Sequence, residues 1–191
     1  MIVEGRVKPA DLPDNRPTLS VVVITRNEER DLPGFLQNFS AIADEIVIVD
    51  DGSTDKTSDI ATGFAAKFGG NIRFLSLPRT NEEGFCDQRN KGVAAAEGEW
   101  LLQVDCDMRL TPELAAEILQ AIMAPELVAY RFRLEQYFLN HRVRYGGFQY
   151  WNQPWLVRKA AIKWSQKLHE RANIDAEPEE IGQLRSRMVH L

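Results

Sequence analysis

Apolar runs alternate with segments of helical periodicity through the first two thirds of the chain. Residues 19–24 and 46–49 are apolar and rich in β-branched side chains, and each run ends in polar residues, as buried parallel strands do. Residues 28–39, between these runs, carry apolar side chains at helical spacing: Leu32, Phe35, Leu36 and Phe39. The three segments predict two parallel strands joined by a crossover helix.

The same alternation continues downstream. We expect a helix over 55–68, a strand over 72–77, a helix over 85–96, a strand over 100–104 and a helix over 112–123. Ser53 or Thr54 can cap the first of these helices, Gly69-Gly70 can end it, and Thr111 can cap the last. This order predicts a doubly wound sheet with helices on both faces.

The pattern changes after residue 129. Residues 130–164 hold ten of the seventeen aromatic residues, and the alternation over 130–134 predicts antiparallel or edge strands. The expected fold class is therefore α/β, with a mostly parallel sheet and a small antiparallel C-terminal portion. In a chain of 191 residues we expect one domain over 19–191, preceded by a Pro-rich arm over 1–18.

Composition narrows the class of protein. Hydrophobic residues make up 44% and charged residues 27% of the chain, as in ordinary globular proteins. No apolar run approaches the roughly 20 residues of a transmembrane helix, and the first eighteen residues lack the apolar core of a signal peptide. Two cysteines, Cys86 and Cys106, are too few for a disulfide framework or a four-cysteine metal site. We therefore expect buried thiols and a cytoplasmic location.

The net charge of −5 is unevenly distributed along the chain. Residues 131–171 hold nine lysines or arginines and two glutamates, a local net charge of +7. Such a segment meets phosphates or an anionic membrane surface, or is simply a solvated surface. Peripheral contact with the inner face of the cytoplasmic membrane is therefore one expectation, and we expect no nucleic-acid partner.

Polar residues follow the first, second and fourth predicted strands. They read Thr-Arg-Asn-Glu over 25–28, Asp-Asp-Gly-Ser-Thr-Asp over 50–55 and Asp-Cys-Asp over 105–107. Ligands of open α/β sheets bind beyond the carboxyl ends of the strands, so these loops should converge on one cleft. Its carboxylates would repel one another without a cation, and hard oxygen ligands suit Mg²⁺ or Mn²⁺.

The polar residues in these loops could also have purely structural roles. Asp-Cys-Asp can be a polar loop that leads to the Thr111 cap, and Asp50 and Asp51 can serve turn and cap chemistry. Neither a Gly-x-Gly-x-x-Gly fingerprint nor a Gly-x-x-x-x-Gly-Lys loop follows the first strand, which argues against dinucleotide binding and P-loop chemistry.

Taken together, three motifs resemble the family 2 glycosyltransferases of GT-A fold. They are Val-Val-Ile-Thr-Arg-Asn-Glu-Glu from Val22, Asp-Glu-Ile-Val-Ile-Val-Asp-Asp-Gly-Ser-Thr-Asp from Asp44, and Gln-Val-Asp-Cys-Asp from Gln103. The resemblance covers residues 19 to about 171 and is nearest to the bacterial lipopolysaccharide core glucosyltransferase-like branch. It implies inverting transfer of a sugar from a nucleoside-diphosphate sugar, with UDP-sugar first, to a hydroxyl of a glycan or lipid-linked acceptor, assisted by Mg²⁺ or Mn²⁺.

The resemblance also implies roles for particular residues. Residues 19–110 would form the nucleotide-binding half and 111–191 the acceptor half. In the first half, Asp51 would hold the base, Asp105 the ribose or the metal, and Asp107 the metal. The base and ribose pocket would be lined by Thr25, Arg26, Asn27 and Glu28.

Three further residues are candidates from the same resemblance. The Arg89 guanidinium would face the nucleotide and pair with phosphate or a carboxylate, unless it is a surface arginine. Glu170 would be the base that deprotonates the acceptor hydroxyl, unless His169-Glu170 is an exposed pair. His169 is an alternative metal ligand because neutral imidazole binds Mn²⁺.

The aromatic residues after position 144 have three possible roles. They can stack on sugar faces, meet lipid at a membrane interface or pack in the core. The residues concerned are Tyr145, Phe148, Tyr150, Trp151 and Trp155.

Two departures from the family pattern affect these expectations. Met108-Arg109 follows Asp107 where the branch usually shows another acidic residue, and the chain ends at His190-Leu191, at what resembles the start of a strand with a functional histidine. We expect a truncated or naturally minimal chain. The alternatives are a non-catalytic nucleotide-sugar or glycan binding module, and a sugar-phosphate nucleotidyltransferase, whose Gly-rich loop after the first strand is missing here.

Overall fold

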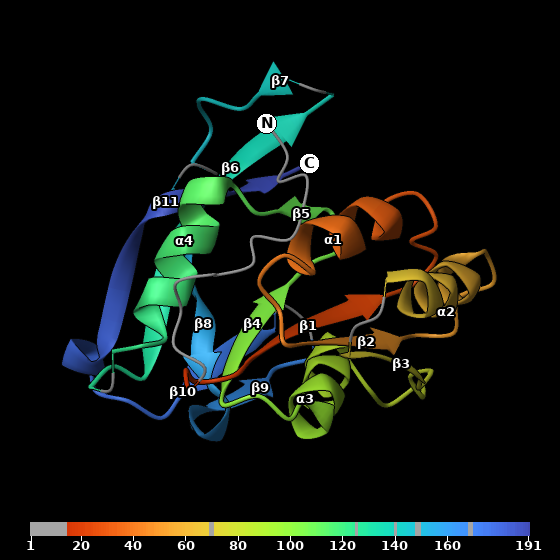
Figure 1. Cartoon of the computed structure of the whole chain (residues 1–191), viewed down its shortest axis with the longest axis horizontal. Helices are drawn as coiled ribbons and strands as arrows, with labels where there is room; N and C mark the ends of the chain where they lie inside the picture. Colours follow the sequence, from red (N-terminus) through yellow and green to blue (C-terminus); the bar gives the residue numbers. More distant parts are fainter. Residues whose placement is uncertain (1–14, 69–70, 125, 140, 148–149, 168–169) are drawn as a thin grey trace.

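The computed structural model describes residues 15–191 except 69–70, 125, 140, 148–149 and 168–169 (Figure 1). The α-helices are α1 (Leu32–Phe39), α2 (Thr57–Phe68), α3 (Phe85–Ala95) and α4 (Pro112–Ala121), and short 3-10 helices span Lys159–Ala161 and Pro178–Glu180. The strands are β1 (Leu19–Thr25), β2 (Glu45–Asp50), β3 (Asn71–Ser76), β4 (Trp100–Val104), β5 (Met108–Arg109), β6 (Ala129–Phe138), β7 (His141–Arg142), β8 (Asn152–Arg158), β9 (Ile162–Ser165), β10 (Arg171–Ile174) and β11 (Ile181–His190).

One large sheet forms the centre of the molecule. Its strand order is β3-β2-β1-β4-β8-β6-β11-β5, and β7 pairs with the end of β6. The first four strands in this order run parallel, β8 is antiparallel to β4 and β6, and β11 is parallel to β6 and antiparallel to β5. A separate antiparallel pair consists of β9 and β10. The expected α/β class, with its antiparallel C-terminal portion, is confirmed.

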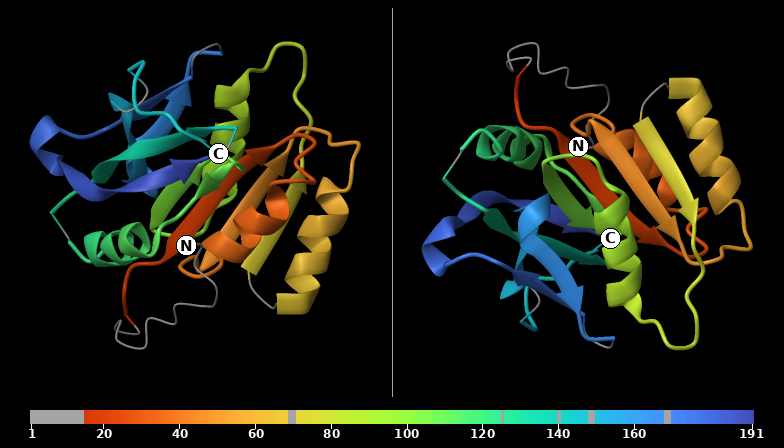
Figure 2. Two further views of the ribbon diagram at one scale, coloured as in Figure 1. Left: turned by 90° about the horizontal axis from the view of Figure 1, so that it is seen from above. Right: turned by 90° about the horizontal axis from the view of Figure 1, so that it is seen from below.

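Both faces of the sheet are covered (Figure 2). Apolar side chains of α1, α2 and α4 pack with one face in a single cluster, whose largest members include Phe35, Phe39 and Trp100. On the other face, α3 and β9 pack over β1, β2 and β4. At Gly92 the helix α3 approaches β1 so closely that a Cβ would collide with Val22. This close packing brings the N-terminal turns of α3 to the cleft described below.

The four predicted parallel strands agree with the structure to within one residue, whereas β6 continues to Phe138, four residues beyond the alternation over 130–134, and two helices begin later than predicted. Helix α1 begins at Leu32 because the loop before it is bound elsewhere, with the Glu28 N–H donating to Thr57 Oγ1 at 2.8 Å. Helix α2 begins at Thr57, and its N–H is bound by Asp55 Oδ1 at 3.0 Å. The predicted caps Ser53 and Thr54 are therefore wrong. Gly69-Gly70 lie outside the described residues.

Helix α4 begins as predicted and ends earlier. The Thr111 hydroxyl accepts a hydrogen bond from the Leu114 N–H at 3.2 Å, and the helix stops at Ala121 rather than Met123. Of the predicted arm, residues 15–18 are described, and Arg16 pairs with Asp44 at 2.5 Å. In the part of the chain that the structure describes, no helix has both the length and the apolar content that crossing a bilayer requires.

Candidate active site

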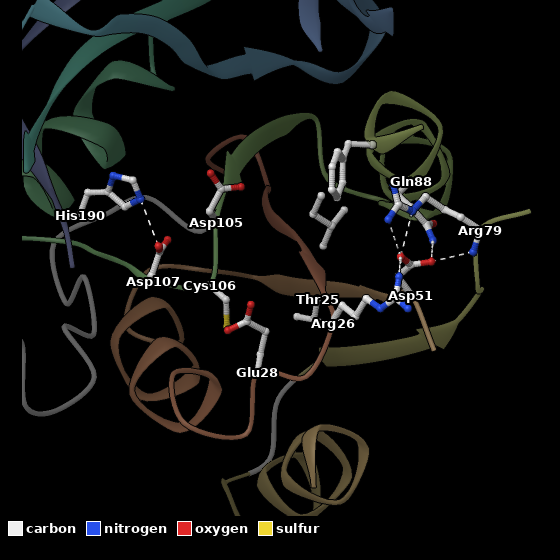
Figure 3. A pocket seen from close by; sticks show the side chains of 12 residues that line it. Thr25, Arg26, Glu28, Asp51, Arg79, Gln88, Asp105, Cys106, Asp107 and His190 are labelled. Atoms are coloured by element: carbon white, nitrogen blue, oxygen red, sulfur yellow. Dashed lines mark hydrogen bonds and ion pairs between the residues drawn. The ribbon is translucent and has the colours of Figure 1, made fainter. Parts of the chain in front are cut away.

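A cleft of about 270 Å³ opens at the carboxyl ends of β1, β2 and β4 (Figure 3). The three polar loops converge there, as predicted from the strand order. The lining also includes the N-terminal turn of α3 and the end of β11. Its residues are Ile24, Thr25, Arg26, Glu28, Asp51, Arg79, Phe85, Gln88, Asp105, Cys106, Asp107 and His190.

Asp51 is held at one end of the cleft by Arg79. Asp51 Oδ2 lies 2.9 Å from Arg79 Nε and 2.8 Å from the Arg79 guanidinium nitrogen NH2, while Oδ1 accepts from the Arg79 N–H at 2.7 Å. Gln88 Nε2 donates to the same Oδ1 at 3.2 Å and to the Leu77 carbonyl at 2.7 Å. Burial raises the pKa of Asp51, but these hydrogen bonds outweigh it and hold the pKa below its usual value. The carboxylate is therefore a fixed anion.

Arg79 also forms one wall of this end of the cleft. Its guanidinium lies 4.1 Å from the centre of the Phe85 ring. Arg26 approaches Asp51 from the opposite loop at 3.4 Å, with 64% of its side chain exposed. A planar cation and an aromatic ring beside a fixed carboxylate offer stacking and hydrogen bonding to a planar base.

Asn27 lies outside the cleft lining and joins two loops. Its backbone has a left-handed φ of 58°, its N–H donates to Ser53 Oγ at 2.8 Å, and its Oδ1 accepts from the Thr54 N–H at 2.8 Å. Asp50 adds to this clamp by accepting from the Ser53 N–H at 2.8 Å and from Thr25 Oγ1 at 3.0 Å. Asp50 therefore has the turn role considered from the sequence.

Glu28 lines the cleft with its carboxyl beside the Cys106 side chain (Figure 3). Its burial, reinforced by the charges of Asp31 and Asp107, raises the pKa of the carboxyl to about 7. Cys106 is buried and free, and its burial raises the pKa of the thiol. Cys86 is a second buried free thiol, as expected. The cleft therefore holds a carboxyl that is easily neutralised.

The other end of the cleft holds Asp107 and His190. His190 Nε2 lies 3.1 Å from Asp107 Oδ2, and Nδ1 lies 2.7 Å from Gln136 Oε1. The hydrogen bond to Asp107 raises the pKa of His190, although burial opposes the shift. The protonated ring donates from Nε2 to Asp107 and from Nδ1 to Gln136; a cation bound at Nε2 would require the remaining ring proton to sit on Nδ1, where Gln136 accepts it.

Asp107 and His190 could hold a divalent cation whose remaining coordination positions are filled by a bound ligand and by water. Asp107 Oδ1 is buried and has no hydrogen-bond partner among the described residues. No group of three or more carboxylate, imidazole or thiol side chains in the described ranges is arranged to hold a metal ion. A carboxylate and an imidazole leave most coordination positions for phosphate oxygens and water, as Mg²⁺ sites on phosphates do.

Arg89 lines a second cavity and pairs with Asp105, which lines both this cavity and the first cleft. Its guanidinium, 7% exposed, lies 2.8 Å from Asp105 Oδ1 and 3.3 Å from Glu170 Oε1, and packs 4.8 Å from the centre of the Trp164 ring. Arg89 thus pairs with carboxylates and is buried, not a surface arginine. Both contacts to Glu170 use Oε1, which leaves Oε2 outside the ion pair.

The second cavity, of about 440 Å³, lies beyond Asp105, which lines both spaces. Aromatic rings, amides and charged groups share its walls. Its lining residues are Arg89, Asp105, Trp151, Gln153, Pro154, Trp155, Trp164, Gln166, Glu170, Arg171 and Ala172.

The structure thus separates the predicted residues into two groups. The first cleft contains Thr25, Arg26, Glu28, Asp51, Asp105 and Asp107, while Arg89 and Glu170 line the second cavity together with Asp105. His169 and Phe148 lie outside the described residues.

Sequence reasoning missed Arg79, Phe85 and Gln88. They follow the edge strand β3 without a recognisable motif. For His190 the signal was the resemblance of the chain end to a strand that carries a functional histidine.

Comparisons with known proteins agree with this architecture. The chain is 32% identical over 118 residues to a TPR repeat-containing protein of Synechococcus elongatus, which covers 62% of this chain and 27% of that protein. It is 38% identical over 94 residues to the PGL/p-HBAD biosynthesis glycosyltransferase Rv2957 of Mycobacterium tuberculosis, covering 48% of this chain and 36% of the relative. The chain therefore spans well under half the length of these curated relatives.

Solved structures share the fold, and a family model covers most of the chain. The UDP complex of S. aureus TarS residues 1-349 matches with a TM-score of 0.65 at 21% identity, over 90% of this chain and 60% of that one. A mannosyltransferase of Pyrobaculum calidifontis, solved with GDP-Man and Mn²⁺, matches with a TM-score of 0.52 at 24% identity, over 69% of this chain and 40% of that one. The model described as "Glycosyl transferase family 2" matches residues 20–174. This chain belongs to glycosyl transferase family 2.

Proposed function

We propose that the chain transfers a sugar, with inversion, from a nucleoside-diphosphate sugar to a hydroxyl of a glycan or lipid-linked acceptor. The observation that carries the proposal is the junction at Asp105. Asp105 lines both the acidic first cleft, where Asp51 would bind the nucleotide base, and the second cavity, which contains aromatic rings and Glu170. A donor and an acceptor would therefore meet at one carboxylate.

The nucleoside would bind at the Asp51 end of the first cleft. Asp51 is held ionised by Arg79 and Gln88, and a base N–H would replace its most distant and most exposed partner, Arg26 at 3.4 Å. Phe85 and Arg79 supply surfaces on which a planar base can stack. Thr25, Arg26 and Glu28 line the same cleft and would contact the base and ribose. UDP is our first candidate because TarS, which shares the fold, is solved with UDP and with UDP-GlcNAc.

The diphosphate would lie at the opposite end, near Asp107 and His190. These two residues, with Asp105 as a further oxygen ligand, would hold Mg²⁺ or Mn²⁺. The cation supplies charge neutralisation for the departing nucleoside diphosphate. Its binding would also relieve the repulsion that keeps Glu28 readily protonated, since Asp107 and Asp105 are among the charges that raise the pKa of Glu28.

Glu170 would act as the general base in the second cavity. The acceptor oxygen forms a bond to the anomeric carbon as the bond from that carbon to the diphosphate oxygen breaks. The hydroxyl proton passes to Glu170 Oε2, while Arg89 holds Oε1. A single displacement of this kind inverts the anomeric configuration. Arg89 is a positioning residue, because it orients both Asp105 and Glu170.

Turnover by the purified chain tests the proposal. UDP-glucose and UDP-GlcNAc labelled at the anomeric carbon would be incubated with Mn²⁺ and a bacterial glycolipid extract, and the products analysed by NMR. We expect labelled glycolipid of inverted configuration together with released UDP. Tight UDP binding with no transfer to any acceptor would favour the non-catalytic binding module instead.

A further inference from the structure

Large apolar side chains are exposed in an unusual concentration near β7. Among the described residues, five of the nine strongly exposed large hydrophobic side chains fall between positions 138 and 151. We call these five the aromatic patch: Phe138 (69% exposed), Leu139 (77%), Tyr145 (84%), Tyr150 (75%) and Trp151 (49%). Scattered single apolar residues are normal on surfaces, but such a concentration within one segment of the chain favours an interaction surface.

Two members of the patch, Phe138 and Leu139, lie on a hairpin that extends beyond the rest of the sheet, and the other three lie on the segment between β7 and β8. Tyr137 pairs with Arg142 and Phe138 with His141 in the antiparallel β6-β7 ladder, and the Val143 N–H donates to the Gln136 carbonyl at 2.8 Å. Figure 1 shows β7 and the end of β6 projecting past the neighbouring strands. Among the described residues, the hairpin therefore stands clear of the rest of the sheet.

The segment that contains the patch carries basic residues and no acidic ones. The chain has 28 acidic residues, yet none falls in the stretch 136–169. Four arginines in or just before this part of the chain are exposed: Arg131, Arg133, Arg142 and Arg144. Arg142 is half-exposed and also contacts Glu135 at 2.9 Å. A segment with exposed rings and exposed arginines, in a chain of net charge −5, is complementary to an anionic surface with an apolar layer beneath it.

We propose that the aromatic patch docks the protein on an anionic phospholipid bilayer. Tyrosine and tryptophan rings favour the depth of lipid headgroups, Phe138 and Leu139 would reach the acyl boundary, and the arginines would pair with lipid phosphates. Lipid is the occupant that uses all three features together: exposed rings, an exposed aliphatic group and exposed arginines.

This docking would place the second cavity at the membrane surface. Trp151 belongs to the patch and also lines the cavity that contains Arg89 and Glu170. If the proposed transfer reaction holds, the acceptor hydroxyl would arrive from the bilayer, attached to a lipid. That last link depends on the proposed function, whereas membrane docking itself does not.

Vesicle flotation of the full chain tests the docking. We expect the protein to float with phosphatidylcholine vesicles that contain about 30% phosphatidylglycerol, to bind pure phosphatidylcholine far less, and to dissociate as salt is raised. The double variant Phe138→Ser with Leu139→Ser should lower partitioning about tenfold or more. Arg142→Gln with Arg144→Gln should lower it about thirtyfold.

Matched variants control for general surface effects. Met123→Ser removes an apolar side chain that is also exposed but lies at the end of α4, and Arg185→Gln removes an exposed arginine of β11. Both should partition as the wild type does, and circular dichroism should show all four proteins folded. Absence of wild-type binding to anionic vesicles, or equal binding by the patch variants, would overturn the proposal. Lipid-independent dimers that the patch variants abolish would overturn it as well. None of these outcomes depends on sugar transfer.

Discussion

His190 Nε2 and Asp107 Oδ2 lie 3.1 Å apart although the two residues are separated by 83 positions in the chain. The sheet brings them together: β11 runs beside β5, which follows Asp107 directly, with His190 opposite Met108 in the ladder. The candidate metal site therefore includes residues of both the nucleotide-binding half and the acceptor half expected from the sequence. Its completion depends on the last strand of the chain.

Gln136 should control the metal affinity of this pair. Gln136→Leu removes the polar partner at 2.7 Å from His190 Nδ1, so the ring loses its orientation and the group that would accept the Nδ1 proton when a cation occupies Nε2. We expect the affinity of the UDP-bound chain for Mn²⁺, followed by electron paramagnetic resonance, to fall by about tenfold or more. UDP affinity in the presence of a chelator should stay the same. Unchanged Mn²⁺ affinity would show that His190 is not a ligand.

Glu28 should make the metal-free protein less stable as pH rises. Its pKa is raised from 4.5 to about 7, so between these values the folded state holds a proton that the unfolded chain has released. Stability therefore falls across this window. Glu28→Gln should raise the free energy of unfolding at pH 8 by about 1–2 kcal/mol, after allowance for solvent screening of a half-buried group. At pH 4.5 the variant and the wild type should be nearly equal.

Urea unfolding at several pH values measures this difference. Glu179→Gln, which alters an exposed glutamate outside the cleft, is the matched control and should show no such trend. A constant difference between Glu28→Gln and the wild type from pH 4.5 to 8 would contradict the assigned environment of Glu28.

Two arginines contact Asp51, and they should differ in their effect on stability. Arg79 holds the buried carboxylate, 8% exposed, through its guanidinium and its backbone, whereas Arg26 is largely exposed and lies 3.4 Å away. Arg79→Ala leaves Asp51 short of its main partner and should cost about 3 kcal/mol of unfolding free energy. Arg26→Ala should cost less than about 1 kcal/mol. Equal losses in urea unfolding would contradict this division.

Substitution of Glu170 should lower the rate of sugar transfer without weakening nucleotide binding. Glu170→Gln keeps the shape of the side chain but removes its basicity, so the rate of transfer should fall by about 10²–10⁴-fold. Calorimetry should show nearly unchanged UDP affinity, because Glu170 lines the second cavity and not the first. Undiminished transfer by this variant would exclude Glu170 as the base, while Glu179→Gln again serves as the control.

The fold of the N-terminal half could be read from the sequence because its signals are local. Strands β1, β2 and β4 are buried on both faces, so continuous apolar runs mark them. The starts of α1 and α2 could not be read in this way. They depend on hydrogen bonds between loops, such as Glu29 N–H to Asp55 Oδ2 at 3.0 Å, which involve residues far apart in the chain.

The C-terminal strands show the opposite case. Strand β11 buries only Leu184 and Met188 deeply, so its sequence carries little strand signal apart from its end. The acidic loops were predicted to converge because parallel strands impose that geometry. Arg79 was not predicted, because its role depends on the contacts of its guanidinium with Asp51 and not on a sequence motif.

The central claim is that Asp107 holds a divalent cation against the diphosphate of a nucleotide sugar. Calorimetric titration of UDP-glucose and UDP-GlcNAc, with Mn²⁺ or with a chelator, on the wild type and on Asp107→Asn tests it most directly. We predict that Mn²⁺ tightens binding to the wild type by about tenfold or more, equivalent to about 1.4 kcal/mol, and has no effect on Asp107→Asn. Metal-independent binding of equal strength in both proteins would contradict the claim.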